Sequence, residues 1–515
     1  MSKIRIIVLV FIILSLTGCP DKPDDNNQII IIKKPAVDAT IEEIIAEQLE
    51  NQEGTLENPA DLIIDIDLGR MIRTGDFWEK ILYAIEEIGK YVNLDLTDCT
   101  VEDQSYNYFN PNYTVTAGKD KIVNLIIPDI ITHIVAGTGA IDYPFKHFTN
   151  LETVSAANVF HIGSFAFYEN TSIKRVFFPK VTEIILSSFY GCTNLEEADF
   201  PLAVTIGDNS FSRCTNLLRV NLPELTRINP FTFYNCINLS EINITKATHI
   251  DQYAFYGCES LIEANFPLIT TLGNYAFSGC KSLESVNFPL VDIIYPNAFS
   301  GCISLTEIAS SNFESAFFIA SNAFYGCENL VSVTFKNVVR VNPEAFGNCT
   351  KLETARFLAD PERTTYPAHP LDPWIERSGI DQEAWTQDSV VFQFDAFINC
   401  VSLRVLDVRN AWNVFFVASS LANIGTHLDL YLFDDDGTRS YGHPVISWFL
   451  GDSPDGFGGP RTITSLNLIL PKEAPIPSKI FYHHPHPQPG YHGIRVQLGD
   501  ANQYGSHVTV NVLYE

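Results

Sequence analysis

The cysteines of this chain are spaced in a way that could support chemistry. Nine of them form one series, mostly 22 residues apart: Cys192, Cys214, Cys236, Cys258, Cys280, Cys302, Cys327, Cys349 and Cys400. In an exported protein, such a series could form disulfide bonds. Counting back by the same interval, however, lands on Asn170 and then on Phe148, which can pack but cannot pair. The sequence therefore predicts free thiols in a core, where cysteine is often found; the role of Cys99, outside the series, stays open.

Histidines near the C-terminus are a second group that could bind a ligand. Four lie close together: His483, His484, His486 and His492. Imidazoles at short intervals can bind zinc, but no cysteine or carboxylate stands at ligand spacing, and the intervening prolines favour a surface loop. Residues 434–437 (DDDG) are similar to the start of a calcium-binding loop, yet Val445 stands where the closing glutamate would be. The histidines are thus weak candidates, and we predict no metal and no cofactor.

Catalytic motifs are missing from the sequence, which contains no G-x-S-x-G, H-E-x-x-H, P-loop or dinucleotide-binding fingerprint. The balance of 33 Lys and Arg against 61 Asp and Glu gives a net charge of −28. That charge argues against a nucleic-acid partner, because binding phosphates requires clustered cations. We predict a binding protein and not an enzyme, and the acidic surface favours a neutral or basic partner.

The N-terminus predicts export and a lipid anchor. A basic start precedes an apolar run over residues 6–16, which would be about 16 Å long as a helix and too short to span a membrane. This is typical of a signal peptide. The run ends in LTGC, residues 16–19, which is similar to the bacterial lipobox, where the cysteine is acylated and begins the mature chain. We expect a signal peptide over 1–18, lipidation of Cys19 and a tether over 19–35.

Other columns keep the phase of the cysteine series. Phenylalanine stands three residues before the cysteine position in each of eleven units, and leucine or isoleucine stands three residues after it, as in Phe277, Cys280 and Leu283. Further apolar residues follow at six and eight, often with a proline after them. A chain of 515 residues is too long for one compact core, and this period indicates a modular stack over 122–408.

Each unit predicts one coil of that stack. Residues 283–288 (LESVNF) alternate apolar and polar side chains, as a short strand does, and the proline after them stops the strand. The next residues have apolar side chains three and four apart, which suits a helical or 3-10 return. A single coil cannot bury its apolar side, whereas stacked coils share a core and align parallel strands about 4.8 Å apart. We therefore expect a curved stack about 50 Å long.

The units resemble the BspA-like, or Treponema-type, leucine-rich repeats. Their consensus, LxxLxLPxxLxxIgxxAFxxCxx, matches residues 261–280 (LIEANFPLITTLGNYAFSGC), and the resemblance covers 122 to about 408. It implies an α/β solenoid: a right-handed stack with a parallel β-sheet on its concave face, short helical or 3-10 returns, and N- and C-terminal caps. Apolar residues such as Leu225 and Ile269 replace the asparagine ladder of common leucine-rich repeats, so functions of other classes are not carried over.

The region ahead of the repeat is expected to cap the stack. Residues 36–121 contain two helical stretches, at about 39–50 and 77–90, and two strand-like runs, at 62–68 and 91–96. A solenoid needs its end covered, so capping is the favoured interpretation.

Two further segments interrupt or follow the repeat. The long interval before Cys400 predicts an inserted loop over 358–391, whose Trp374 and Trp385 either contact a partner or pack against the solenoid. For residues 409–515, a cap of degenerate coils and a small β module both remain open.

The outward side chains of the predicted strands form a candidate binding face. Because residues two apart on a strand share a face, two polar columns are expected to lie side by side. They contain Glu197, Asp199, Arg219, Asn221, Glu241, Asn243, Glu263, Asn265, Asn287 and Glu307. Stacked asparagines can simply stabilise the sheet through hydrogen bonds, or they can form the extended polar surface with which solenoids bind ligands.

The resemblance implies an adhesin-like function, because members of the family attach to host extracellular-matrix and serum proteins and to other bacteria. We therefore expect a lipoprotein anchored in the bacterial outer membrane, with its repeats on the cell surface. The alternative is a periplasm-facing lipoprotein that acts as a scaffold for other envelope proteins.

Overall fold

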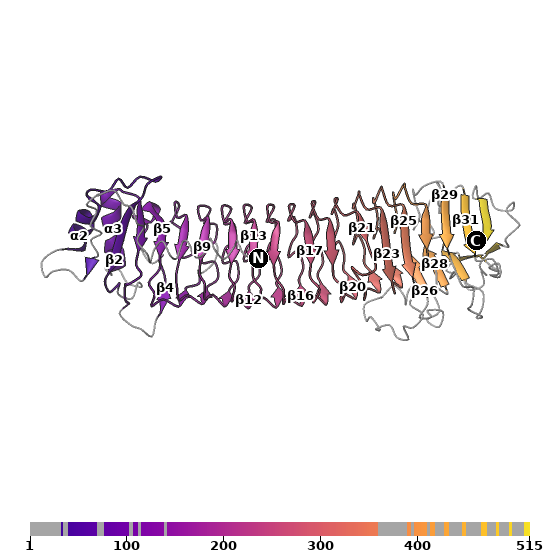
Figure 1. Cartoon of the computed structure of the whole chain (residues 1–515), viewed down its shortest axis with the longest axis horizontal. Coiled ribbons are helices and arrows are strands. Elements are labelled where there is room, and N and C mark those ends of the chain that lie inside the picture. The colour runs from indigo at the N-terminus through magenta and orange to yellow at the C-terminus, as the bar shows by residue number, and fades with distance from the viewer. Residues whose placement is uncertain are drawn as a thin grey trace, which may run out of the picture.

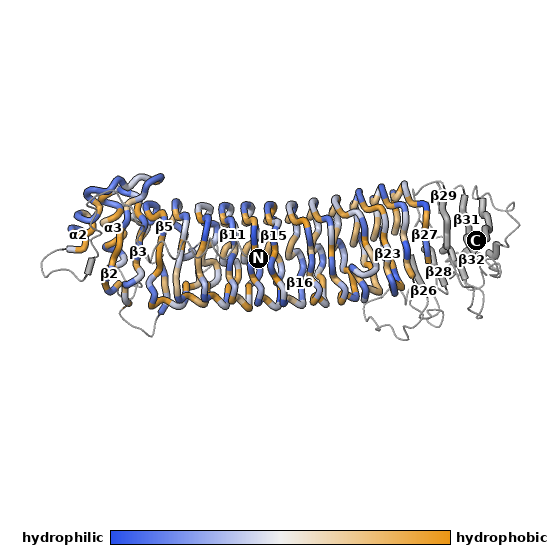
Figure 2. The backbone as a smooth tube through the Cα atoms, viewed as in Figure 1, coloured by the Kyte–Doolittle hydropathy of each residue, from blue (hydrophilic) through white to orange (hydrophobic). Residues whose placement is uncertain are grey.

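The protein is an elongated stack of coils in a computed structural model (Figure 1). The structure describes residues 32–33, 40–68, 77–101, 107–111, 115–137, 142–358 and 396–408, and the backbone of strands at 389–392, 413–417, 427–431, 445–449, 465–470, 480–483, 494–496 and 509–514. Hydrophobic and hydrophilic residues alternate along the whole described tube (Figure 2). The apolar residues form one continuous interior, as stacked repeats require.

The N-terminal region contains two helices and two strands close to where the sequence predicted them. Helix α2 (Ile41–Leu49) begins with a capping box, in which the Thr40 hydroxyl accepts from Glu43 N at 3.3 Å and the Glu43 carboxylate accepts from Thr40 N at 3.0 Å. Helix α3 (Phe77–Ile88) buries an apolar face that includes Trp78. Strands β2 (Ala60–Asp65) and β3 (Val92–Asp95) pair in parallel. The sheet runs β1-β2-β3-β5-β7-β9, so this region extends the ladder of the repeat.

One side of the stack carries the strands predicted from the L-x-x-V-x-F pattern, and we call it the long ladder. All neighbouring pairs recorded within it are parallel. Beyond β1 (Ile32–Lys33), β2 and β3, its strands are β5 (Ile122–Ile126), β7 (Thr153–Ser155), β9 (Arg175–Phe177), β11 (Glu197–Asp199), β13 (Arg219–Asn221), β15 (Glu241–Asn243), β17 (Glu263–Asn265), β19 (Ser285–Asn287), β21 (Glu307–Ile308), β23 (Ser332–Lys336), β25 (Thr354–Leu358), β27 (Val405–Asp407), β29 (His427–Tyr431), β31 (Ser465–Leu470) and β34 (Thr509–Tyr514).

The sequence did not predict the second ladder, which we call the short ladder. Most of its strands have two residues, of which the first faces outward and the second is buried, as in Arg227 and Ile228. They are β4 (Tyr108–Phe109), β6 (His133–Ile134), β8 (His161–Ile162), β10 (Glu183–Ile184), β12 (Thr205–Ile206), β14 (Arg227–Ile228), β16 (His249–Ile250), β18 (Thr271–Leu272), β20 (Ile293–Ile294), β22 (Phe318–Ile319), β24 (Arg340–Val341), β26 (Ser389–Phe392), β28 (Asn413–Val417), β30 (Val445–Phe449), β32 (Ile480–His483) and the antiparallel β33 (Ile494–Val496).

The return of each coil consists of turns, where the sequence predicted a helical or 3-10 segment. Hydrogen bonds of the 3-10 type are present, such as Cys258 N to Phe255 O at 3.2 Å and Tyr256 N to Tyr253 O at 3.3 Å. They do not become consecutive, because Tyr253 and Gly257 have left-handed φ angles of 58° and 70°. Within 122–137 and 142–358 the chain forms no α-helix or 3-10 helix; the 3-10 helix η1 (Lys119–Lys121) lies just before.

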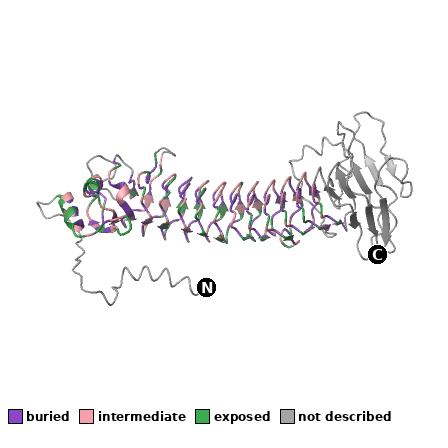
Figure 3. Ribbon diagram, turned by 90° about the horizontal axis from the view of Figure 1, so that it is seen from above, coloured by how far each residue is buried: buried purple, intermediate pink, exposed green. Residues whose placement is uncertain are grey.

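The predicted core columns are confirmed. The phenylalanines stack ring on ring, with centroids 5.2 Å apart for Phe233 and Phe255 and 5.0 Å apart for Phe255 and Phe277. The cysteine, leucine and phenylalanine columns are buried throughout the described coils. Every described cysteine carries a free thiol, and Cys99 is buried like the others. Figure 3 shows buried residues recurring in coil after coil along the described stack.

The described stack is nearly straight in two perpendicular views (Figures 1 and 3). A leucine-rich repeat bends when one side carries strands about 4.8 Å apart and the other carries helices about 8–10 Å apart. Here both sides carry strands, so neither side is longer than the other. The face expected to be concave is therefore almost flat.

The pairing of strands continues beyond the predicted end of the repeat at residue 408. Strands β27, β29, β31 and β34 extend the long ladder in parallel, and β28, β30 and β32 extend the short one. The strands of the C-terminal region thus follow the same two-ladder arrangement as the repeats. In the part of the chain that the structure describes, no helix has the length and apolar content needed to cross a membrane.

Candidate binding surface

The polar side chains predicted to form a binding face lie in two columns on the long ladder. The register aligns Glu197 with Arg219 and Glu241, and it aligns Asn265 with Asn287. The middle residue of these strands points into the core, so its two neighbours face outward. We call Glu197, Arg219, Glu241, Glu263 and Glu307 the charged column, and Asp199, Asn221, Asn243, Asn265 and Asn287 the amide column.

The amide column is linked by hydrogen bonds between successive coils. Asn221 Nδ2 donates to Asp199 Oδ1 at 2.6 Å, and Asn243 Nδ2 donates to Asn221 Oδ1 at 2.6 Å. Asn287 Nδ2 donates likewise to Asn265 Oδ1 at 2.8 Å. These bonds fulfil the stabilising role considered for the column. Each amide nitrogen carries a second N–H, so the bonds leave donor capacity for a ligand.

The charged column is more exposed and more acidic. Arg219 Nη2 lies 3.2 Å from Glu197 Oε2, in a pair whose side chains are 55% and 41% exposed. Such a pair contributes little to stability. Among the described residues, Glu241, Glu263 and Glu307 form no ion pair. The two columns together thus present five carboxylates and one guanidinium on a nearly flat face.

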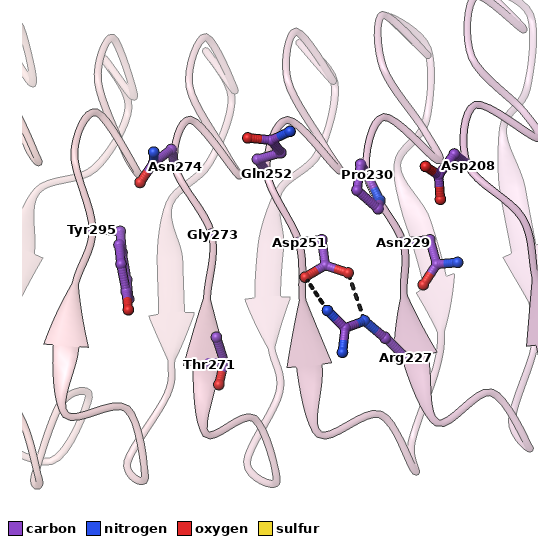
Figure 4. Close-up of a pocket in the computed structure, with 10 residues that line it drawn as sticks. All are labelled: Asp208, Arg227, Asn229, Pro230, Asp251, Gln252, Thr271, Gly273, Asn274 and Tyr295. Carbon is purple, nitrogen blue, oxygen red and sulfur yellow. Dashed lines mark hydrogen bonds and ion pairs between the residues drawn. The ribbon is translucent and has the colours of Figure 1, made fainter.

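A trough crosses the short ladder, on the side of the coil away from these columns. It is open and has a volume of about 540 Å³. Polar side chains from five successive coils line it (Figure 4). The lining residues, which define the trough, are Asp208, Arg227, Asn229, Pro230, Asp251, Gln252, Thr271, Gly273, Asn274 and Tyr295.

A bidentate ion pair occupies the middle of the trough (Figure 4). Arg227 Nε donates to Asp251 Oδ2 at 2.6 Å, and Arg227 Nη2 donates to Asp251 Oδ1 at 2.7 Å. The Asp251 side chain is 16% exposed, whereas that of Arg227 is 54% exposed. Hydrogen bonding to Asp251 raises the pKa of Arg227 above its ordinary value. Asp208 is left as a second carboxylate near one end, and Tyr295 stands at the other.

Sequence reasoning missed this trough because it assigned the residues to a helical return. The signal that could have revealed it lies two residues before the core phenylalanine. Phe231, Tyr253 and Tyr275 occupy this position in three successive coils, directly after the trough residues Pro230, Gln252 and Asn274.

Other candidate residues from the sequence lie outside the described part of the structure. These are Cys19, Trp374, Trp385, His484, His486 and His492. For His483 the structure describes only the backbone, in strand β32. Among the described side chains, no group of three or more His, Cys, Asp or Glu residues is arranged to hold a metal ion.

Comparisons with known proteins address the repeat directly. A family model described as the BspA type leucine rich repeat region (6 copies) matches residues 138–262 and 248–365. A search of curated proteins finds no match.

Solved structures of leucine-rich repeat proteins are similar at low identity. A leucine rich cell surface protein from Faecalibacterium prausnitzii is 23% identical, with 44% of this chain and 83% of that chain covered and a TM-score of 0.24. A leucine-rich repeat protein from Bacteroides ovatus is 20% identical, with 64% and 87% covered and a TM-score of 0.36. The leucine rich repeat protein of T. pallidum is 23% identical, with 43% and 77% covered and a TM-score of 0.23.

The parallel ladders and the shared Phe, Cys and Leu core define a leucine-rich repeat solenoid. Within that class, the repeats over residues 138–365 match the BspA type, as their consensus predicted.

Proposed function

We propose that this protein is a lipid-anchored surface protein that binds other macromolecules through its long ladder, in the manner of an adhesin. Its ligands would be host extracellular-matrix or serum proteins, or proteins on other bacteria. The observation that carries the proposal is the alignment of the charged and amide columns on adjacent, hydrogen-bonded strands. Solenoids of this kind bind ligands over extended surfaces.

The rigidity of the ladder supports binding. Hydrogen-bonded parallel strands fix the backbone positions of the two columns, so the backbone loses little conformational freedom when a ligand binds. The excess of carboxylates favours a ligand with a basic surface, because complementary charge accelerates association and excludes acidic partners. Leucine-rich repeat proteins generally bind protein ligands, and the BspA type is typical of binding scaffolds without catalytic activity. We therefore propose binding as the whole of its activity.

Membrane attachment would come from Cys19. Acyl chains contribute about 0.8 kcal/mol for each buried CH₂ group, and two or more chains hold a protein stably on a membrane. Replacing Cys19 with alanine should release the protein from the membrane fraction into the soluble fraction and abolish incorporation of labelled fatty acid. Unchanged fractionation would contradict lipid anchoring at this residue.

The binding face is tested by a charge-matched pair of variants. Glu241→Gln/Glu263→Gln removes two carboxylates from the charged column. The control, Glu259→Gln/Glu328→Gln, removes two carboxylates from the turn on another side of the coil, where Glu328 is exposed and the Glu259 side chain is 46% exposed and forms an exposed ion pair with Lys281. In a solid-phase assay on immobilised fibronectin and fibrinogen, the first variant should bind at least fivefold more weakly than the second. Equal binding by the two variants would move the site to the 358–391 insertion or to the termini.

The alternative remains a scaffold lipoprotein facing the periplasm. Protease treatment of intact cells separates the two: a surface protein is digested, whereas a periplasmic protein survives until the outer membrane is opened.

A further inference from the structure

We propose that the trough on the short ladder binds a neutral carbohydrate chain that runs along the axis of the stack. This site is separate from the long-ladder face and needs no protein ligand.

The lining of the trough suits a ligand rich in hydroxyl groups. Ten residues line it, and none has a large aliphatic side chain. Carboxylates such as Asp208 accept hydrogen bonds, while amides such as Asn229 and Asn274 donate as well as accept. Together they can bind neighbouring hydroxyls of one sugar unit.

The repeat geometry suits a polymer. Successive strands of a parallel ladder are about 4.8 Å apart, which is close to the length of one sugar unit in an extended chain. Five coils each contribute to the trough, from that of Asp208 to that of Tyr295. A glycan lying along the axis could therefore meet a new set of polar groups at each unit.

A row of three aromatic residues directly follows the trough residues Pro230, Gln252 and Asn274 in the sequence, although its rings are not part of the lining. Phe231, Tyr253 and Tyr275 have left-handed φ angles of 57°, 58° and 57°. This conformation costs an ordinary residue about 1–2 kcal/mol and is unusual for a bulky side chain. Phe165 repeats the feature nearer the N-terminus. The other coils fill the same position with smaller or polar residues, namely Ser187, Asn209, Asn297, Asn322 and Glu344.

The coincidence of strain and location points to a ligand. The three strained aromatics occupy the three coils whose short strands, β14, β16 and β18, form the sheet beneath the trough. The fold does not need them, because asparagine adopts left-handed φ angles more readily and stands there in neighbouring coils. The left-handed backbone itself recurs at this position in the coils from Phe165 to Glu344. What the fold does not require is a bulky aromatic ring there, and a cost of that kind is characteristic of functional sites.

The shape of the row suits a sugar. Ring centroids are 4.9 Å apart for Phe231 and Tyr253 and 4.7 Å apart for Tyr253 and Tyr275, with nearly parallel planes. Neighbouring rings therefore cover each other's faces. Because the row is half-buried, what remains for a ligand is the ring edges and the hydroxyl groups of the two tyrosines. Such a strip is apolar and also hydrogen-bonding, and it matches a sugar, which has both C–H surfaces and hydroxyl groups.

The charge of the site selects against acidic glycans. Arg227 is already paired with Asp251, and Asp208 leaves the trough with an excess of negative charge. The whole chain carries a net charge of −28. Sulfated or uronic-acid polymers would be repelled, so the predicted ligand is a neutral polysaccharide.

Affinity electrophoresis tests this proposal on the purified full chain. Native gels would contain β-glucan, mannan, xylan or galactan, with heparin as the acidic comparison. We expect at least one neutral polysaccharide to retard the protein, and we expect heparin to leave its migration unchanged. Tyr253→Asn should weaken that retardation at least tenfold without unfolding the protein, because Asn297 adopts the same backbone conformation. Asp251→Ala should weaken it similarly.

A matched aromatic variant controls for general effects. Tyr190→Ser removes a half-exposed ring outside the trough, in a column where the next coil has Ser212, and should be retarded like the wild type. The proposal is overturned if no neutral polysaccharide retards the wild type, if only heparin does, or if Tyr253→Asn and Asp251→Ala are retarded normally. It is also overturned if these variants lose fibronectin or fibrinogen binding but not glycan binding, which would assign the trough to a protein. This test is independent of the proposed function: if Glu241→Gln/Glu263→Gln does not change protein binding, the expected retardation by polysaccharide stays the same.

Discussion

The cysteine column combines packing with hydrogen bonding at every coil. The thiol of Cys258 donates to the carbonyl of Phe233 in the preceding coil at 3.2 Å, and the thiol of Cys280 donates to the carbonyl of Phe255 at 3.2 Å. Each of these carbonyls also accepts a backbone N–H, as Phe255 O does from Cys258 N at 3.2 Å, so the thiol supplies the second hydrogen bond to a buried oxygen. Asn170 fills the same role in the second unit, where its Nδ2 donates to the carbonyls of Phe145 and Phe148. Asparagine can therefore stand in this column as a donor, in addition to packing.

The same column predicts a loss of stability in alkali. Burial raises the thiol pKa above its ordinary value of 9.0 for Cys192, Cys214, Cys236, Cys258, Cys280, Cys302 and Cys349, and does the same for Cys99 outside the column. The folded chain thus keeps protons that the unfolded chain releases above pH 9. The stabilisation is fully present below that pH and falls by about 1.4 kcal/mol per thiol for each further pH unit.

Thermal melts between pH 7 and 11 measure this effect. The melting temperature should fall with increasing steepness above pH 9 because of these thiols. The variant Cys280→Ala/Cys302→Ala should begin from a lower melting temperature, since it loses two hydrogen bonds, but show a shallower decline. An identical decline in both proteins would contradict titration of the column.

At the scale of the element, the turns depend on a second left-handed position just before the cysteine. Gly257, Gly279, Gly301 and Gly326 have φ between 70° and 76°, and Asn235 stands there at 56°. Glycine reaches this region freely, whereas a β-branched residue does not. The position keeps the 3-10 turns of each return from continuing as a helix.

Substitution at Gly279 tests the requirement. Gly279→Val should lower the free energy of unfolding by about 1–2 kcal/mol, measured by urea denaturation. Gly279→Asn should cost clearly less, because Asn235 shows that this side chain fits the column. Similar losses for both variants would indicate steric crowding in place of backbone strain.

The strands and the core were predictable because they repeat with a fixed period. Phe255, Cys258 and Leu261 each belong to a column that a single sequence displays several times. The short ladder was not predictable in the same way, because two residues such as His249 and Ile250 are too few to show alternation. The trough was missed for a related reason: its lining side chains differ from coil to coil, and the aromatic residues that follow them in the sequence recur in only three successive coils.

At the scale of the whole molecule, stability should be shared between neighbours. In the described repeats each coil packs on the coil before it and the coil after it, so these repeats should behave as a row of units joined by interfaces. The Phe column makes this continuous, since Phe255 stacks on Phe233 on one side and on Phe277 on the other. Within the described residues, the straight axis keeps the two ends of the stack apart.

Phe255→Ala should therefore open the stack locally. Removing a fully buried phenylalanine costs about 3–5 kcal/mol, and the loss falls on two interfaces. Hydrogen-exchange mass spectrometry should show faster exchange in the coils from Phe233 to Phe277, including the amide of Phe233 that donates to the carbonyl of Ala254. Coils before residue 190 and after residue 320 should keep the protection of the wild type.

The control variant Tyr256→Ser, which removes a half-exposed ring, should leave the exchange pattern nearly unchanged. Uniform loss of protection along the chain after Phe255→Ala would show that the repeats unfold as one cooperative unit, and the nearest-neighbour description would then be wrong.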